Sequence, residues 1–157
     1  MASPLFNIVL VSPEIPWNVG AIGRTVVALG ARLIIIKPTL VDLSDKAVKR
    51  AGLDYWPHVD LKMYESWDEF LAGEKIEEEK LYFLSTKADK TLFETEITER
   101  PYLVFGAESK GLPEFYHKTY GKRLFKLPMY GEQIRSLNLA NTVTAVAYEA
   151  VRQINFR

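Results

Sequence analysis

Three short polar segments of this chain each follow an apolar run and hold side chains that can bind a ligand. In residues 125–151, an apolar strand leads into a loop that places Arg135, Ser136 and Asn138 at the start of a helix. These side chains form hydrogen bonds, and Gly131 frees the backbone just before them. The segment is either a ligand loop or a capped core helix in which Ser136 or Asn138 is the N-cap.

A second segment, residues 6–25, predicts a buried strand, a proline-containing turn and a helix with Gly20 and Gly23 in its first turns. A glycine costs about 1 kcal/mol relative to alanine inside a helix, so two together suggest that something approaches the backbone closely. Helix-on-sheet packing is the structural alternative. Arg24 stands just beyond the carboxyl end of the first strand, where it could bind a phosphate or simply be solvated.

The third segment, residues 101–113, predicts a buried strand followed by a polar turn between Gly106 and Gly111. Glycine at the tip of a strand lets a ligand lie against main-chain amides. Glu108 lies inside this turn, where a carboxylate can brace the loop, receive a cation or take part in catalysis. We place bracing ahead of catalysis.

The elements that must position these residues alternate along the chain. We expect strands at residues 6–11, 32–37, 81–85, 102–106 and 123–128, a weaker strand at 58–63, and helices at 18–29, 43–51, 67–72, 112–119 and 136–154. Such alternation predicts an α/β fold with a mostly parallel sheet and helices on both faces. With 48% apolar residues, residues 1–157 are expected to form a single domain.

Composition narrows the class of protein. The net charge is zero, which argues against a protein that coats nucleic acid indiscriminately. Residues 115–126 nevertheless contain four basic residues, Lys122 and Arg123 among them, and no acid, while residues 74–79 are acidic. This asymmetry would let one side contact phosphates, and two ordinary solvated faces are the alternative.

Several site classes are disfavoured by the same sequence. The chain contains no cysteine, which removes disulfides and thiolate metal sites and fits a reducing compartment. We see neither a secretory start nor a membrane-spanning run, and therefore expect a cytoplasmic protein without a membrane partner. The first turn lacks the three-glycine dinucleotide pattern, and no phosphate-binding loop ending in lysine and serine or threonine occurs, so an NAD enzyme or a nucleotide hydrolase is not expected.

Together the three segments resemble motifs one, two and three of the SPOUT class of RNA methyltransferases. The resemblance is nearest to the branch that methylates the ribose 2′-hydroxyl of the wobble nucleotide of tRNA. It runs from residue 6 to residue 156 and includes the sequence RAGLDY at residues 50–55, which is typical of that branch. The motifs occur in the right order and at the right separations.

The resemblance implies a SPOUT-type fold with a deep trefoil knot in its carboxy-terminal part and S-adenosyl-L-methionine bound in the knotted loops. Position by position, it implies that main-chain groups and apolar surface for the adenosine come from Leu84, Gly106 and Leu127. Three further side chains would complete that wall: Met129, Ser136 and Asn138. The product would be S-adenosyl-L-homocysteine. No metal is expected, because methyl transfer from a sulfonium needs no Lewis acid.

For the substrate side, the resemblance implies that Asn18 and Arg24 are the catalytic residues and face the RNA. We expect further RNA contacts from Arg135, Lys122 and Arg123. An arginine is essentially always protonated, so we assign Arg24 an electrostatic and positioning role and leave the general base open. The implied substrate is the anticodon stem-loop of leucine tRNAs, modified at cytidine 34 or at a 5-modified uridine 34.

Family members are homodimers, and the terminal helix is a natural interface. On it we expect four side chains to be available to a partner, unless the helix is simply buried within one chain: Val143, Ala147, Tyr148 and Val151. Two other functions stay open. The enzyme could methylate another tRNA or rRNA ribose, or the chain could be a non-catalytic dimer that binds the cofactor or RNA.

Overall fold

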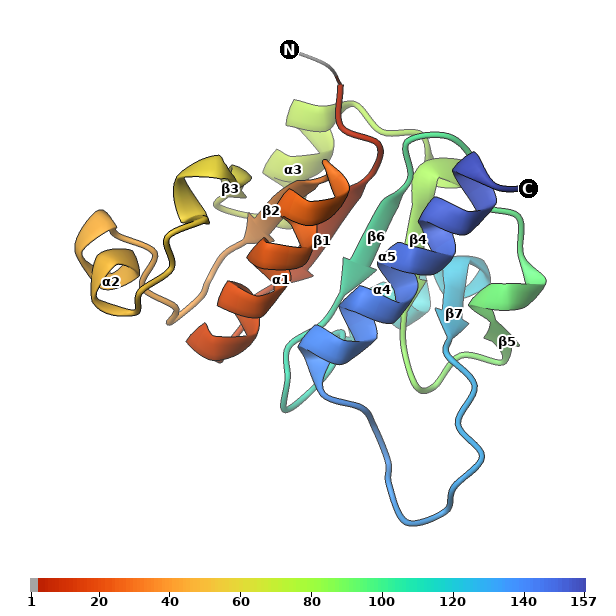
Figure 1. The fold of residues 1–157 in the computed structure, drawn as a ribbon. Coiled ribbons are helices and arrows are strands. Elements are labelled where there is room, and N and C mark those ends of the chain that lie inside the picture. Colours follow the sequence, from red (N-terminus) through yellow and green to blue (C-terminus); the bar gives the residue numbers. More distant parts are fainter. Residues whose placement is uncertain (1–2) are drawn as a thin grey trace.

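A seven-stranded parallel sheet forms the centre of the computed structural model, which describes residues 3–157 (Figure 1). The strand order is β3-β2-β1-β6-β4-β7-β5, and every pair of neighbours is parallel. The strands are β1 (Asn7–Val11), β2 (Arg32–Ile36), β3 (Asp60–Tyr64), β4 (Leu81–Leu84), β5 (Lys90–Thr91), β6 (Tyr102–Phe105) and β7 (Leu124–Lys126). The predicted fold class is therefore confirmed, and the two-residue strand β5 is an addition to it.

Helices cover both faces of this sheet (Figure 1). They are α1 (Pro16–Leu29), α2 (Asp45–Arg50), α3 (Trp67–Glu74), α4 (Glu114–Thr119) and α5 (Leu139–Asn155). Short 3-10 helices occur at Trp56–His58, Glu78–Lys80, Leu92–Glu94 and Gly121–Arg123. On one face α1 and α5 lie side by side, where Thr25 and Thr144 share a hydrogen bond of 3.1 Å between their hydroxyls. The other face carries α3 and α4.

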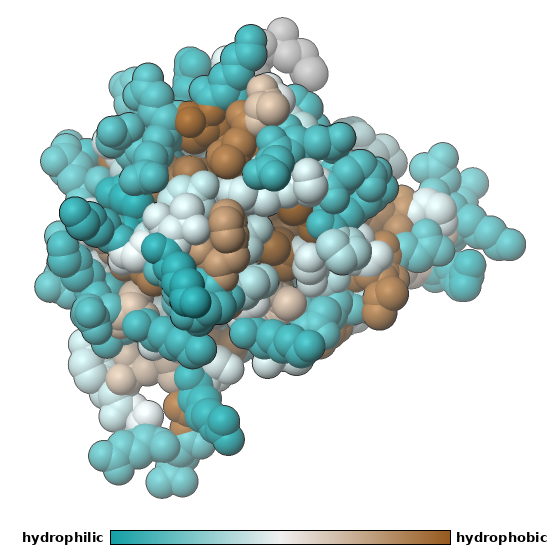
Figure 2. Space-filling view, turned by 180° about the vertical axis from the view of Figure 1, so that it is seen from behind, coloured by the Kyte–Doolittle hydropathy of each residue, from teal (hydrophilic) through white to brown (hydrophobic). Residues whose placement is uncertain are grey.

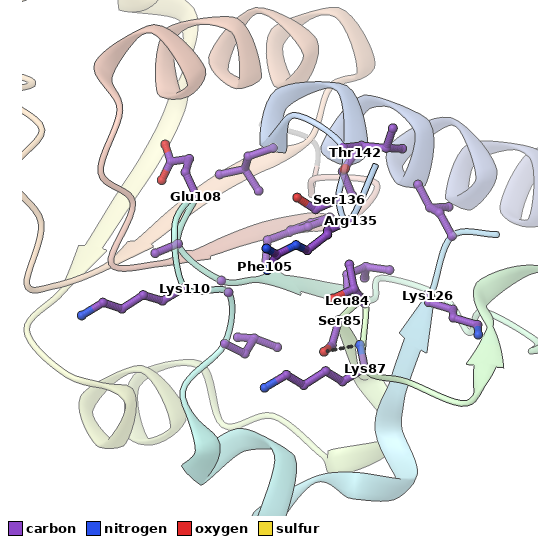
Figure 3. A pocket seen from close by; sticks show the side chains of 18 of the residues that line it. Leu84, Ser85, Lys87, Phe105, Glu108, Lys110, Lys126, Arg135, Ser136 and Thr142 are labelled. Atoms are coloured by element: carbon purple, nitrogen blue, oxygen red, sulfur yellow. Dashed lines mark hydrogen bonds between the residues drawn. The ribbon is translucent and has the colours of Figure 1, made fainter. Parts of the chain in front are cut away.

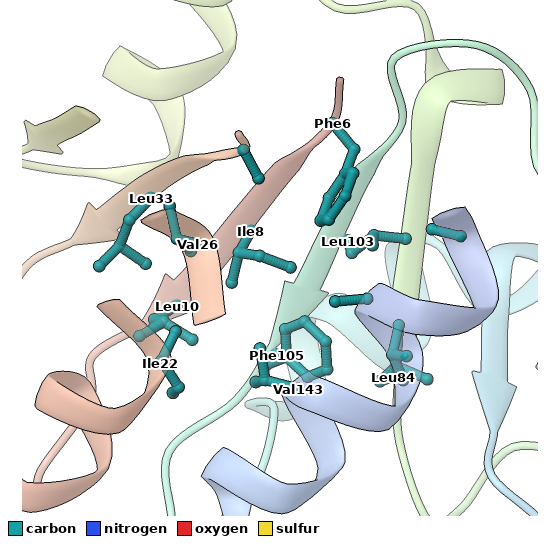
Figure 4. Close-up of a cluster of buried hydrophobic side chains, with 14 of the residues drawn as sticks. Phe6, Ile8, Leu10, Ile22, Val26, Leu33, Leu84, Leu103, Phe105 and Val143 are labelled. Carbon is teal, nitrogen blue, oxygen red and sulfur yellow. The ribbon is translucent and has the colours of Figure 1, made fainter. Parts of the chain in front are cut away.

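Two apolar clusters, one on each face, hold these layers together. Alternate residues of β1 point to opposite clusters: Ile8 packs with α1 and α5, whereas Val9 packs with α3 and α4. Figure 4 shows the first cluster, in which Ile22 of α1 and Val143 of α5 meet the sheet. Burial on both faces explains why residues 8–11 of the strand are an unbroken apolar run. The back of the molecule is dominated by hydrophilic residues with several separate apolar areas (Figure 2).

Helix starts differ from the prediction in ways that local chemistry explains. α1 begins at Pro16 rather than at residue 18, since proline is well suited to the first position of a helix. α5 begins at Leu139, because the side chain of Asn138 accepts a hydrogen bond from the amide of Asn141 at 3.1 Å and caps the helix. Residues 127–138 are consequently a loop, and Ser136 lies within it rather than at the cap.

The terminal helix gives less to a partner than we expected. Val143 and Ala147 are fully buried in the core of their own chain, so they cannot form an interface. Tyr148 remains 54% exposed, and Val151 is half-buried.

The trefoil knot stays a prediction. Across residues 3–157, no helix has both the length and the apolar character that crossing a membrane requires.

Candidate functional site

A cavity of about 710 Å³ opens at the carboxyl ends of β4, β6 and β7 (Figure 3). Leu84 and Phe105 end two of these strands, and Leu127 follows the third. The first turn of α5 closes another side with Leu139 and Thr142. The carboxyl end of a parallel sheet is where α/β proteins usually bind ligands.

The chemistry of the cavity wall is divided. Leu84, Phe105 and Leu127 give part of the lining an apolar surface, which suits a flat ring system. Ser85 and Ser136 bring hydroxyl groups to the wall. Cationic side chains also line it: Lys87, Lys110, Lys126 and Arg135. The lining therefore offers an apolar slot, hydrogen-bonding groups and positive charge for an anionic group of a ligand.

At the edge of the cavity, which Glu108 itself lines, one hydrogen-bonded junction joins all three polar segments found in the sequence. Glu108 accepts hydrogen bonds from the amides of Glu14 and Ile15, both at 2.8 Å, and from Nδ2 of Asn18 at 3.2 Å. Asn138 Nδ2 in turn donates to Oδ1 of Asn18 at 3.1 Å. Asn18 is only 3% exposed, so its amide is committed to this junction.

Glu108 thus braces the start of α1, where backbone amides lack partners within the helix and a negative charge is favourable. The contact is reciprocal, because Glu14 accepts hydrogen bonds from the Ser109 amide at 3.0 Å and the Ser109 hydroxyl at 2.7 Å. Those bonds from Ser109 lower the pKa of Glu14. Both carboxylates therefore bind the turn after β6 to the turn after β1, and the structure supports the bracing role.

At both glycines of α1 the neighbour is the protein's own chain rather than a ligand. A Cβ atom at Gly23 would lie 2.4 Å from Cζ3 of Trp56, which is too close for any real contact. A Cβ atom at Gly20 would lie 3.4 Å from Cδ1 of Leu53, an ordinary contact distance. Residues 53–56 therefore lie directly on the helix. Packing of Trp56, rather than ligand approach or packing on the sheet, accounts for Gly23, whereas the contact distance at Gly20 leaves room for a Cβ atom.

Gly106 has a similar internal reason. It lines the cavity, but a Cβ atom there would stand 2.1 Å from the carbonyl carbon of Gly111 and 2.2 Å from the amide nitrogen of Leu112. The turn after β6 folds back on this residue, with Ala107 and Gly111 paired in an isolated bridge. The cavity wall keeps its shape because position 106 carries no side chain.

Arg24 is exposed on α1 and is not among the residues that line the cavity. Its guanidinium carbon lies 5.4 Å from the ring centroid of Tyr55, within cation–π range. The Tyr55 hydroxyl donates a hydrogen bond of 2.7 Å to the carbonyl of Gly20. Of the two residues predicted to be catalytic, Asn18 lies in the junction beside the cavity, and Arg24 lies on the outer surface of the same helix.

Of the four basic residues in the stretch at 115–126, only Lys126 lines the cavity. Arg123 precedes β7, at the opposite end of the strand, where Nε donates to the carbonyl of Leu81 at 3.0 Å and Nη2 to that of Glu79 at 3.1 Å. Its guanidinium also stacks 4.5 Å from the Tyr82 ring centroid. These contacts give Arg123 a structural role, and its neighbour Lys122 lies at the same remote end. Besides Arg24, we expected RNA contacts from Arg135, Lys122 and Arg123. Of these three residues, only Arg135 lines the cavity.

Of the residues predicted to bind the cofactor, five line the cavity: Leu84, Gly106, Leu127, Met129 and Ser136. Asn138 reaches the site through the junction instead.

Sequence reasoning missed a pair in which the Ser85 hydroxyl lies 2.9 Å from Nε2 of His117 (Figure 3). Ser85 could have been found from its place just after a strand, but no pattern points to His117. Within residues 3–157, no group of three or more histidine, cysteine, aspartate or glutamate side chains gathers to hold a metal ion.

Known proteins share both the sequence and this architecture. Residues 5–148 match the SpoU rRNA Methylase family. The chain is 41% identical to the tRNA (cytidine(34)-2'-O)-methyltransferase of Saccharophagus degradans and 37% identical to that of Burkholderia cenocepacia, with 97% of each chain covered. A solved structure described as giving insights into the 2-OH methylation of C/U34 on tRNA is 44% identical, with a TM-score of 0.84 and 97% of both chains covered. The SpoU methyltransferase AviRb from Streptomyces viridochromogenes, solved in complex with AdoMet, is 26% identical, with a TM-score of 0.80 over 98% of this chain and 62% of that one.

Proposed function

This chain belongs to the SpoU rRNA Methylase family, and we propose that it transfers a methyl group from S-adenosyl-L-methionine to the 2′-hydroxyl of the ribose at position 34 of tRNA. The relatives that are 37–44% identical over 97% of the chain support this substrate. The structural observation that carries the proposal is the junction of Asn18, Glu108 and Asn138 beside a cavity at the carboxyl end of the sheet. The target nucleotide is cytidine or a 5-modified uridine, in leucine tRNAs.

The volume of the cavity lies in the range usual for small-molecule sites, and the chemistry of its lining suits S-adenosyl-L-methionine. Leu84, Leu127 and Met129 would enclose the adenosine, with Ser136 supplying a hydroxyl. The cations at positions 87, 110 and 126 can attract the carboxylate of the methionine part. When bound, this cofactor supplies an activated methyl group on a sulfonium, which leaves S-adenosyl-L-homocysteine.

The side chains of the protein then have to position the RNA. Arg24 and Arg135 supply positive charge for phosphates near the target ribose, and Arg24 stabilises charge that develops on the reacting 2′-oxygen. Asn18 holds the first turn of α1 in place through its two hydrogen bonds, so that Arg24, on the same helix, has a fixed base. A metal ion has no role in this proposal.

We further propose that the active form is a homodimer. Arg24 is exposed and does not line the cavity of its own chain, which favours a site to which two subunits contribute. Tyr148 and the neighbouring surface of α1 and α5 are the proposed contact.

One sheet and its helices span residues 7–155, so we treat residues 1–157 as a single methyltransferase domain that acts on tRNA in the cytoplasm.

Two alternatives stay open. The SpoU family description names rRNA, so another RNA ribose is the second candidate, although AviRb, the SpoU methyltransferase compared above, is less similar than the position-34 relatives. The third is a dimer that binds the cofactor or RNA without turnover. The presence of both Asn18 and Arg24 argues against it.

The first experiment measures transfer of labelled methyl from S-adenosyl-L-methionine to total tRNA from a strain that lacks the matching activity, and then maps the modified nucleotide. Label on the 2′-oxygen of a pyrimidine at position 34 is the expected result. Label on another ribose would keep the reaction and replace the substrate. Absence of label both on this tRNA and on rRNA from the same strain, with the cofactor bound, would overturn the proposed activity.

A further inference from the structure

Tyr55 contacts α1 at two points that lie one helical turn apart. Its hydroxyl donates to the carbonyl of Gly20 at 2.7 Å, and its ring lies 5.4 Å from the guanidinium carbon of Arg24. In an α-helix, the carbonyl of Gly20 is also the acceptor for the amide of Arg24. The same tyrosine therefore holds both the backbone that precedes Arg24 and the charged end of its side chain.

Tyr55 belongs to an arm, residues 53–56, that is itself held against α1. It follows α2 through a turn at Gly52, whose φ of +71° lies in the left-handed region that favours glycine. Leu53 then packs at Gly20 and Trp56 at Gly23, the two positions of α1 without side chains. A tyrosine hydroxyl is protonated at neutral pH, and burial raises the pKa of Tyr55 further above its ordinary 10.0, so the hydroxyl is a hydrogen-bond donor.

Arg24 is an exposed side chain with many rotamers, and ordering it on a phosphate has an entropic cost. A ring that already restrains the guanidinium lowers that cost, and an aromatic face is attractive to a cation. We propose that Tyr55 is a positioning residue for Arg24, which it holds in the orientation that meets the RNA backbone. This inference rests on the proposed role of Arg24 in binding RNA.

A purely structural role makes a different prediction. If Tyr55 only packed the arm against α1, Leu53→Ala, which loosens the same contact at Gly20 without touching Arg24, would reproduce its effects. Tyr55→Phe keeps the ring and removes only the hydroxyl, whereas Tyr55→Leu removes the aromatic face. The comparison of these three variants separates orientation of Arg24 from packing.

The test measures the dissociation constant for tRNA, which does not require turnover. We expect Tyr55→Leu to weaken binding about two- to fivefold, the factor that corresponds to an exposed cation–π contact. Tyr55→Phe and Leu53→Ala should stay near the wild-type value. In an Arg24→Ala background, Tyr55→Leu should have no further effect, because the group that it orients is gone. Equal losses with and without Arg24, or a loss in Leu53→Ala that matches Tyr55→Leu, would overturn the proposal.

A second readout needs neither RNA nor cofactor. The Nε–H signal of Arg24 in protein labelled with ¹⁵N-arginine, assigned by its absence in Arg24→Lys, should be displaced by the ring current of Tyr55. It should return toward the ordinary position in Tyr55→Leu and keep its displacement in Tyr55→Phe. An unchanged Arg24 signal in Tyr55→Leu would contradict the proposal. If wild-type protein bound tRNA but transferred no methyl group, the proposed function would fail while these two measurements still decided the role of Tyr55.

Discussion

Asn138, the N-cap of α5, donates a hydrogen bond to the side-chain oxygen of Asn18 in α1, across 120 residues of sequence. Asn18 in turn donates a hydrogen bond to Glu108, which also accepts hydrogen bonds from two backbone amides in the turn before α1. The starts of two helices and the turn after β6 are thereby locked together beside the cavity. A buried polar network of this kind is strong when every member is satisfied and costly when one is lost.

Asn18→Asp should break this junction. The new carboxylate would face the carboxylate of Glu108 and would lose the donor that Glu108 now accepts. We expect a loss of about 1–3 kcal/mol in the free energy of unfolding, measured by urea denaturation at pH 7. The matched control is Asn155→Asp at the exposed carboxyl end of α5, where the new charge should cost no more than about 0.3–1 kcal/mol. Equal stability of the two variants would show that the junction contributes nothing.

Arg24→Ala should abolish methyl transfer and leave the affinity for S-adenosyl-L-methionine unchanged. The reason is that Arg24 does not line the cavity, so its removal takes away only contacts with RNA and with the reacting oxygen. Single-turnover transfer and calorimetric titration of the cofactor measure the two quantities. Arg157→Ala, at an exposed arginine of the carboxy terminus, serves as control for the change in charge. Full activity in Arg24→Ala would disprove its assigned role.

Gly106→Ala should eliminate cofactor binding while the protein remains folded. The added Cβ atom would collide with the backbone of Gly111 and Leu112, and the turn that forms one wall of the cavity would have to move. Gly121→Ala is the control, because a Cβ atom there meets no heavy atom within 4 Å. The measurement is cofactor titration of both variants, alongside circular dichroism. Wild-type affinity in Gly106→Ala would mean that this wall does not contact the cofactor.

The buried Glu74 should make stability depend on acid. Burial alone would raise the pKa of this carboxyl, but hydrogen bonds from Tyr64, Lys62 and Tyr102 outweigh it and lower the pKa from its ordinary 4.5. A depressed pKa in the folded state means that the unfolded chain binds the proton first. The stabilisation is therefore complete above pH 4.5 and is lost as the pH falls through the folded value.

Tyr64→Phe tests this account, because it removes one donor to the Glu74 carboxylate. We expect it to lower the free energy of unfolding by about 1.5–3 kcal/mol at pH 7, the range for a hydrogen bond to a charged group. The difference from wild type should shrink once Glu74 is protonated. Urea unfolding at pH 7 and at pH 3 measures it, with Tyr130→Phe as control, since that side chain is 92% exposed. A difference that stays constant with pH would contradict the assignment.

Much of the fold could be predicted because burial on both faces leaves a clear pattern. The run at β1 and the spacing of apolar residues in α5 fix their elements from local sequence alone. Strand β5 could not be found in this way, because its two residues are defined only by their pairing with β7. The start of α5 likewise depended on which of Ser136 and Asn138 capped the helix, and only the structure selects Asn138.

Within the site, the sequence pattern found the segments but not the contacts between them. The cavity does bring together Leu84, Gly106 and Leu127. The packing of Trp56 on Gly23 and the structural role of Arg123 depend on residues that are distant in sequence, and no periodicity encodes them. A basic residue in a basic stretch looks the same whether it meets RNA or its own backbone carbonyls.

The order of the elements along the chain determines when the site can form during biosynthesis. The cavity needs the ends of β4, β6 and β7 and then the first turn of α5, so its last wall, at Thr142, is made only after all seven strands have been synthesised. Strands β1 to β3 and helix α1, which carries Arg24, leave the ribosome before the elements that form the cavity have been synthesised. A nascent chain therefore cannot gain stability from the cofactor until α5 has been synthesised, and the part made before it must rely on its own core or on chaperones.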